Sequence, residues 1–230
     1  MKIKKTLAAL AAAAVAVTMC AGLAACGNGG GGDTDIPEKP DKNPTGGSSI
    51  TIEAEYIELE NVSGAGISSN QSGIEMIYGT GEQEDKDKGW SNGYYVGYTY
   101  TKECVMEFVF ESDKETTAQI SIRLASELGD LTLTPREFEI TLNGSTMNYG
   151  SWSVRDSGGG MAGAVFNDYI VGQNAKIVKG ENKLVVSVKD NTLYNDKSIG
   201  APLIDCVKVK TSDATVTYNP IDNPAHKGEI

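Results

Sequence analysis

The sequence predicts an all-β protein built as an antiparallel β-sandwich or jelly roll. From Ile50 onward, apolar residues recur at every second position, which is the period of a strand with one buried face. The apolar runs are short and are separated by Gly- and Asn-containing turns. Outside the N-terminus, no window of ten or more residues carries an amphipathic helical stripe. Many short strands joined by such turns are typical of sandwiches and jelly rolls.

The first segment, residues 1–25, is predicted to be a lipoprotein signal peptide. Three lysines among the first five residues precede the apolar run Leu7–Met19, which is shorter than the about 20 residues of a membrane span. The run ends in Leu23-Ala24-Ala25-Cys26, which resembles the bacterial lipobox. We expect an extracytoplasmic protein, lipid-anchored through Cys26 to the bacterial cell membrane or envelope. The alternative is an ordinary secretory signal followed by a free thiol.

The remainder of the chain divides into a tether, one domain and a tail. Residues 26–48 are rich in Gly and Pro and are predicted to form a flexible tether. Residues 49–211 hold the alternating segments and form the predicted domain. Residues 212–230 contain two prolines and few apolar residues, so we expect a poorly ordered tail.

The predicted strands follow from local patterns. Asn143-Gly144 after the apolar run is a hairpin signal. In the last strand, Val207 and Val209 face one side, and Lys208 and Lys210 face the other. The expected strands are 50–56, 105–110, 118–125, 138–142, 175–178, 183–188 and 203–210. Cys104 and Cys206 lie in two of these regions; they form either a disulfide, which export permits, or two buried thiols.

Composition restricts the function to classes that need neither polyanion binding nor histidine chemistry. The formal net charge of −11 argues against nucleic acid as a partner, because nucleic acid is held mainly by Lys and Arg. The single histidine, His226, lies close to the C-terminus and argues against Ser-His-Asp or Cys-His catalysis. We therefore expect a binding protein and not an enzyme.

Two acidic residues near the start of the domain are candidate metal ligands. Glu53 and Glu55 are two residues apart in the first predicted strand, so both carboxylates should point to one face. Such oxygen ligands suit Ca²⁺, which takes six to eight oxygens at about 2.3–2.6 Å. The alternative is a solvated polar strand face.

Several short motifs occur in an order that resembles a known family. They are Ile52-Glu53-Ala54-Glu55, Tyr95-Val96-Gly97-Tyr98, Arg123-Leu124-Ala125-Ser126, Gly180-Glu181-Asn182-Lys183-Leu184 and Leu203-Ile204-Asp205. Together they resemble carbohydrate-binding modules of the family 6 and family 35 type, over about residues 49–211. The resemblance implies a galactose-binding-like jelly roll and a structural Ca²⁺ held by Glu53, Glu55 and Asp205.

The resemblance also implies a sugar-binding cleft between loops. Tyr98 matches an aromatic residue that stacks on the sugar, and Phe166 matches a second one that faces it. The family often has Asn where this chain has Leu203, so the amide that would bind sugar hydroxyls is missing. This departure alters or removes the standard cleft.

Two insertions add candidate ligand-binding residues. The segment 79–95 contains Trp90 and Tyr95, and the segment 149–163 contains Trp152. Loops on a rigid β scaffold are frequent binding sites. The alternative is that both tryptophans fill the ends of the sandwich as additional core.

The sequence therefore predicts a monomeric lipoprotein that binds glycan without catalysis, through loops of a calcium-stabilised β-sandwich. The alternative function is a structural or protein-interaction domain of the cell envelope that has lost the sugar site.

Overall fold

The computed structural model describes residues 47–60, 62, 77–79, 89–97, 99, 104–189, 193–194, 197–198 and 202–223, with backbone only for 193–194 and 197–198. All of them belong to the unit Asp41–Ile230. Cys26 and Tyr98 lie outside the described residues, as do the predicted signal and nearly all of the tether. None of the described helices is both long and apolar enough to span a membrane.

The described strands form two large antiparallel sheets. The six-stranded sheet has the order β10-β5-β14-β3-β2, with β1 also paired to β14. Its strands are β1 (Ser49–Glu53), β2 (Ile77–Gly79), β3 (Tyr94–Val96), β5 (Thr116–Ala125), β10 (Asn167–Ile177) and β14 (Leu203–Thr211). The five-stranded sheet has the order β15-β4-β11-β7-β8. Its strands are β4 (Val105–Ser112), β7 (Phe138–Leu142), β8 (Ser145–Thr146), β11 (Gly180–Val188) and β15 (Val216–Thr217).

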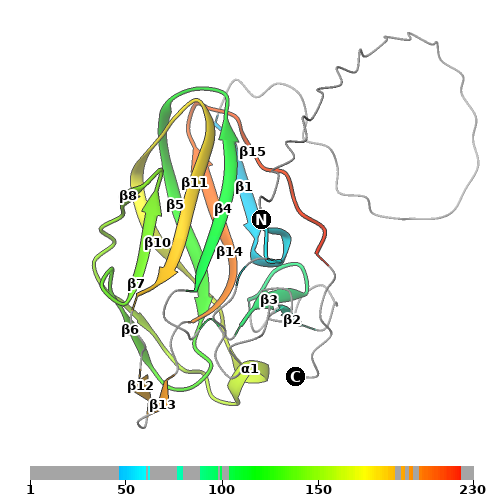
Figure 1. Ribbon diagram of the computed structural model, residues 1–230, viewed down its shortest axis with the longest axis vertical. Coiled ribbons are helices and arrows are strands. Elements are labelled where there is room, and N and C mark those ends of the chain that lie inside the picture. Colours follow the sequence, from blue (N-terminus) through cyan, green and yellow to red (C-terminus); the bar gives the residue numbers. More distant parts are fainter. Residues whose placement is uncertain are drawn as a thin grey trace, which may run out of the picture. The chain divides into compact units, whose positions relative to one another are not determined.

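Shorter elements complete the described fold. They are the 3-10 turn η1 (Ala54–Tyr56), the pairs β6 (Leu131–Leu133) with β9 (Trp152–Val154) and β12 (Leu193–Tyr194) with β13 (Lys197–Ser198), and the one-turn helix α1 (Gly160–Gly163). In Figure 1 the long strands of both sheets run along the vertical axis, and α1 lies at the lower end near β3.

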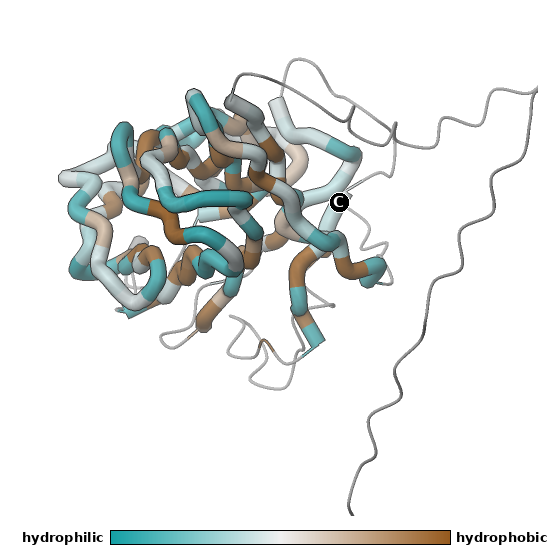
Figure 2. The backbone as a smooth tube through the Cα atoms, turned by 90° about the horizontal axis from the view of Figure 1, so that it is seen from above, coloured by the Kyte–Doolittle hydropathy of each residue, from teal (hydrophilic) through white to brown (hydrophobic). Residues whose placement is uncertain are grey.

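The core lies between the two sheets, because each sheet turns its apolar side chains toward the other. In β4 every second residue is buried, and Figure 2 shows the alternation of apolar and polar residues along such strands. One core cluster contains Phe108 from the five-stranded sheet together with Ile120 and Val207 from the six-stranded sheet. The predicted antiparallel β-sandwich is confirmed.

Most predicted strands are present, with two differences. The hairpin after β7 is confirmed: Asn143 and Gly144 both have positive φ, 50° and 77°, as a type I′ turn requires. β10 begins at Asn167, eight residues before the strand predicted at 175–178. β1 ends at Glu53, and η1 replaces the last part of the strand predicted at 50–56.

The prediction of a poorly ordered tail from residue 212 is wrong for residues 212–223. β15 pairs with β4, and Val216 is buried. The Val216 amide donates to Ser48 Oγ at 2.8 Å, and the Ile221 amide donates to the Tyr56 carbonyl at 2.8 Å. The sequence pattern missed this segment because its order comes from pairing with the start of the domain, about 165 residues away in sequence.

One buried amide organises the turn between β10 and β11. Asn182 is fully buried. Its Oδ1 accepts from the Val178 amide at 2.8 Å and from Asn143 Nδ2 at 2.9 Å, and its Nδ2 donates to the Val178 and Gly180 carbonyls. The side chain therefore joins the β7–β8 hairpin to the turn between β10 of the six-stranded sheet and β11 of the five-stranded sheet, and it satisfies backbone groups of that turn.

Replacing Asn182→Ala should lower the free energy of unfolding by about 3 kcal/mol, because it removes a fully buried side chain that makes four hydrogen bonds. Urea unfolding measures the change. The matched control is Asn174→Ala, an exposed residue of β10, which should change the free energy by less than about 0.5 kcal/mol. Equal effects from the two substitutions would contradict the role of Asn182.

Candidate functional site

Three predicted metal ligands come together where the first and last long strands meet. Glu53 ends β1, Glu55 lies in η1, and Asp205 lies in β14. Asp205 is fully buried, Glu55 is 3% exposed, and Glu53 is half-buried. We call these residues the carboxylate cluster. Glu53 and Glu55 do not share a strand face as predicted: the chain leaves β1 after Glu53, and η1 carries Glu55.

A β-bulge places Asp205 in this cluster. In the pairing of β14 with β5, Ile204 lies opposite Leu124 and Cys206 lies opposite Arg123, so Asp205 is the extra residue. Consecutive side chains in a regular strand point to opposite faces. Here a carboxylate oxygen of Asp205, the Sγ of Cys206 and a carboxylate oxygen of Glu53 all lie within 4.8 Å of one another.

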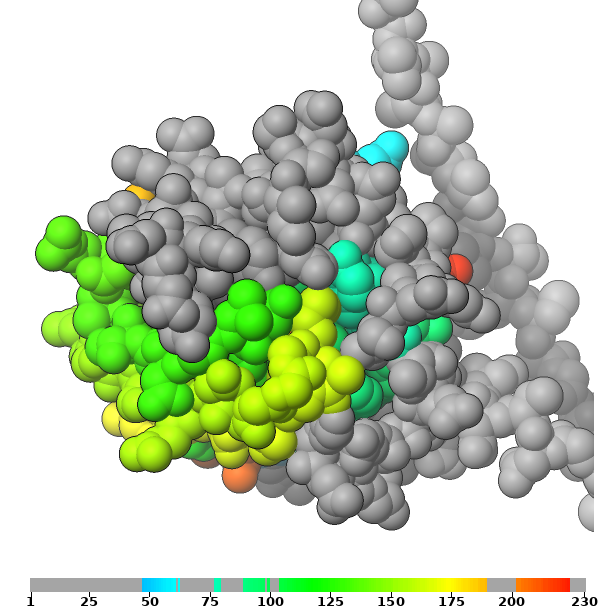
Figure 3. All heavy atoms as spheres, turned by 90° about the horizontal axis from the view of Figure 1, so that it is seen from below, coloured from blue at the N-terminus to red at the C-terminus, as the bar shows by residue number. Residues whose placement is uncertain are grey.

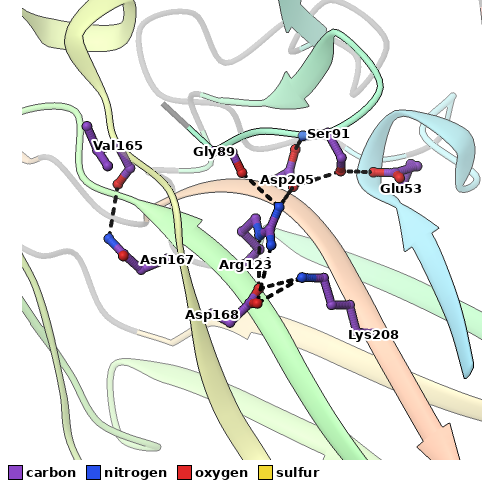
Figure 4. Close-up of polar contacts among 9 residues, drawn as sticks. All are labelled: Glu53, Gly89, Ser91, Arg123, Val165, Asn167, Asp168, Asp205 and Lys208. Atoms are coloured by element: carbon purple, nitrogen blue, oxygen red, sulfur yellow. Dashed lines mark hydrogen bonds and ion pairs between the residues drawn. The ribbon is translucent and has the colours of Figure 1, made fainter. Parts of the chain in front are cut away.

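Ser91 holds two of the carboxyl groups. Its amide donates to Asp205 Oδ1 at 2.8 Å, and its Oγ lies 2.7 Å from Glu53 Oε2 and 2.9 Å from Asp205 Oδ2 (Figure 4). A hydroxyl has one proton to donate, so one of these two contacts needs a proton on the carboxyl group. The arrangement therefore suits either a shared proton or a cation that replaces it.

Glu55 has an oxygen with no partner. Asn92 Nδ2 donates to its Oε1 at 2.9 Å, while its buried Oε2 makes no hydrogen bond. The Asn92 backbone has a φ of 53°, a conformation that Asn adopts more readily than most residues. The Asn223 side chain donates to the Glu55 carbonyl at 3.0 Å, so the segment after β15 packs against this side of the cluster.

Burial makes the carboxyl groups of the cluster weaker acids than exposed ones. It raises the pKa of Glu53 to about 7 and that of Glu55 to about 8, and it also raises the pKa of Asp205. Repulsion from neighbouring carboxylates contributes in the same direction. Each carboxylate is therefore costly to ionise unless a positive charge joins it.

The nearest cations are already shared with another acid. Arg123 Nη1 lies 3.9 Å from Asp205 Oδ2, but Arg123 Nε donates to Asp168 Oδ1 at 2.9 Å. Lys208 Nζ also donates to Asp168, at 2.8 Å (Figure 4). Burial acts to raise the pKa of Asp168, but these hydrogen bonds outweigh it and lower the pKa. Among the described residues, the ionised cluster and Asp168 would carry four negative charges against the two positive charges of Arg123 and Lys208, so a divalent cation would balance the charge.

Of the two predicted sugar-stacking residues, Tyr98 and Phe166, the structure describes only Phe166, and that ring packs with two of the other predicted ligand-binding residues. Trp90, Tyr95 and Phe166 form one aromatic cluster with ring centroids 5.1–6.1 Å apart, and each is at most 6% exposed. Leu203 is fully buried in the same cluster, and Met161 of α1 packs against it. Figure 3 shows the surface of the segment that carries α1 directly against the segment that carries β3. These rings pack against one another and present no open face to a sugar.

Trp152 does not belong to the aromatic cluster of Trp90, Tyr95 and Phe166. It is buried in the main core cluster, stacked on Tyr149 at 3.9 Å and tilted against Tyr169 at 5.4 Å. The tryptophans thus fill the sandwich, which was the alternative interpretation of the two insertions.

Cys104 and Cys206 are buried free thiols, so the possible disulfide is not formed.

Two adjoining hollows lie on the six-stranded sheet. The first, of about 330 Å³, is bordered by the apolar residues Ile50, Ile170 and Val209 and by Thr51, Ser121, Asp168 and Lys208. The second, of about 220 Å³, is bordered by Thr117, Gln173 and Asn174, and Gln119 and Lys210 border both. We call the two hollows the outer groove. The alternation of Lys208 and Lys210 with Val207 and Val209 predicted a polar face, but only the strand order shows which side chains adjoin it.

Comparisons with known proteins find structural similarity only. No protein-family model and no curated protein matches this chain. A family 35 carbohydrate-binding module from Cellvibrio japonicus is 12% identical, with a TM-score of 0.45, and the alignment covers 78% of this chain and 100% of that one. A module of the same family from Clostridium thermocellum is 18% identical, with a TM-score of 0.43 and coverage of 70% and 97%. A β-(1,4)-mannanase from Podospora anserina that contains such a module is 18% identical, with a TM-score of 0.45; the alignment covers 75% of this chain and 29% of the mannanase.

Proposed function

We propose that this protein is a non-catalytic glycan-binding module, exported and lipid-anchored through Cys26, whose β-sandwich is stabilised by Ca²⁺. The observation that carries the proposal is the convergence of Glu53, Glu55 and Asp205. These residues come from opposite ends of the domain, and they are the positions to which the sequence resemblance assigns the structural cation of glycan-binding modules. Their meeting supports the resemblance as a whole.

The donor set of the cluster suits calcium. Three carboxyl groups supply hard oxygen ligands, Glu55 Oε2 has no hydrogen-bond partner, and the local charge is negative. Glu53, Glu55 and Asp205 would hold the ion, with Ser91 Oγ as a neighbouring oxygen. Bound there, Ca²⁺ supplies the positive charge that joins β1 and η1 to β14.

The outer groove is the surface that best fits a glycan. Because the aromatic cluster is closed by Leu203, sugar would bind where hydroxyl and amide groups remain accessible. The groove offers the side chains of Gln119, Gln173 and Asn174 together with Lys210, and none of these four makes a hydrogen bond or ion pair with the described residues. Amides and cations of this kind bind hydroxyl and carboxylate groups of saccharides.

Substitutions in the groove should weaken glycan binding. Gln119→Ala and Lys210→Ala should each lower the affinity about tenfold, because each removes about one hydrogen bond of roughly 1.4 kcal/mol. Titration calorimetry with neutral and uronic-acid polysaccharides measures the effect. Lys183→Ala, on the five-stranded sheet, is the matched control and should leave the affinity unchanged.

The calorimetry distinguishes whether the protein binds glycan at all from whether it binds glycan in the outer groove. No heat from the wild-type protein with any member of a broad polysaccharide panel would refute glycan binding. Binding that is equal in the wild-type protein and both groove variants would refute the groove as the site.

A second function is favoured by one observation. Leu203 is fully buried with Trp90, Tyr95 and Phe166, so Phe166, one of the two rings that the resemblance assigns to the cleft, packs against the protein itself. This supports a structural or protein-interaction domain of the cell envelope. Capture of an envelope protein by a chain that binds no polysaccharide would favour this function.

A further inference from the structure

A thiol lies inside the carboxylate cluster. Cys206 is fully buried, and its Sγ lies within 4.8 Å of a carboxylate oxygen of Glu53 and of one of Asp205. The bulge at Asp205 causes this juxtaposition, because it lets two consecutive residues of β14 turn toward the end of β1. A core cysteine such as Cys104, which packs among apolar residues, has no such surroundings.

The separation of the three atoms is compatible with one small cation. Zn²⁺ binds cysteine sulfur at about 2.3 Å and carboxylate oxygen at about 2.0–2.2 Å, so two ligands of one tetrahedral ion lie about 3.5 Å apart. The three atoms already lie within 4.8 Å of one another, so rotations of the side chains can bring them to this spacing. Calcium, by contrast, takes oxygen ligands and makes no use of a thiol.

A second feature also indicates a cation. Glu55 is only 3% exposed, and its Oε2 makes no hydrogen bond. Asn92, which holds the other oxygen of Glu55, directly follows Ser91, which contacts both Glu53 and Asp205. A buried, unpartnered carboxylate oxygen thus belongs to a residue that Asn92 and Ser91 link to the candidate ligands.

We infer that the cluster binds Zn²⁺ through Cys206 Sγ and the carboxylates of Glu53 and Asp205. On binding, the thiol loses its proton to solvent and the sulfur forms a bond to the metal as a thiolate. This inference rests on the cation site of the proposed function. Because Zn²⁺ and Ca²⁺ would share Glu53 and Asp205, binding of one ion excludes the other.

Cobalt(II) tests the thiolate, since it takes zinc sites and gives a near-ultraviolet sulfur-to-metal charge-transfer band. The protein is the reduced full chain with Cys20→Ser and Cys26→Ser, so that Cys104 and Cys206 are the remaining cysteines. We expect the band to saturate at one cobalt per chain and to decrease on addition of Zn²⁺. It should persist in Cys104→Ser and disappear in Cys206→Ser. A missing band, or a band unchanged by Cys206→Ser, overturns the inference.

X-ray absorption of the zinc-loaded protein is a second test that needs no substitution at Cys206. We expect one sulfur neighbour at about 2.3 Å together with oxygen neighbours. A shell of oxygen alone overturns the inference. Neither result depends on glycan titration. Failure of the zinc tests would therefore not contradict glycan binding, and failure of glycan binding would not contradict the zinc site.

Discussion

Raising the pH from about 5 to about 8 should destabilise the cation-free protein. The unfolded chain releases the Glu55 proton near the ordinary glutamate pKa of 4.5, whereas burial keeps that proton on the folded chain up to about pH 8. Between these values the folded state binds more protons than the unfolded state, so the free energy of unfolding falls as the pH rises. Glu55 alone should cost on the order of 3 kcal/mol across this range, and Glu53, with its pKa of about 7, acts in the same direction.

Calcium should reverse this loss. Urea unfolding in excess chelator at a series of pH values gives the falling curve, and the same series in calcium should stay nearly level above pH 7. An ion at 100 times its dissociation constant adds about 2.7 kcal/mol. If the two series coincide at pH 8, no structural ion is present; if the chelated series rises with pH, the carboxylates are not buried as described.

Glu55→Gln should stabilise the cation-free protein at pH 8 while removing its response to calcium. The amide keeps an oxygen for Asn92 Nδ2 but cannot ionise, so the cost of a buried carboxylate disappears, and we expect a gain on the order of 3 kcal/mol. Because an amide nitrogen replaces one carboxylate oxygen of Glu55, a calcium ion loses an anionic oxygen ligand. Thermal unfolding with chelator and with calcium measures both effects.

Glu115→Gln is the matched control for this substitution. Glu115 is exposed in the turn between β4 and β5, so its replacement should leave both the stability and the calcium response unchanged. A destabilised Glu55→Gln variant that still responds to calcium would contradict the assignment of Glu55 to the cation site.

The surroundings of the aromatic residues are a feature that the sequence does not specify. Trp90 lies in an insertion predicted to bind ligand, and the resemblance assigned Phe166 to the sugar cleft, yet both belong to one buried cluster with Leu203. Whether a ring faces solvent or a neighbour depends on contacts between β3, β14 and the segments around them. No local pattern encodes those contacts, so the burial of these residues could not be predicted.

By itself, the sequence determined the fold class, most of the long strands and the hairpin at Asn143. The alternation of apolar residues is a local property, and it fixes which face of each strand is buried. Tertiary structure decided three other features: the bulge that turns Asp205 and Cys206 toward Glu53, the position of Ser91 between two carboxyl groups, and the outer groove. Each depends on strand register and on packing between segments that are far apart in the sequence, which the pattern within one strand does not specify.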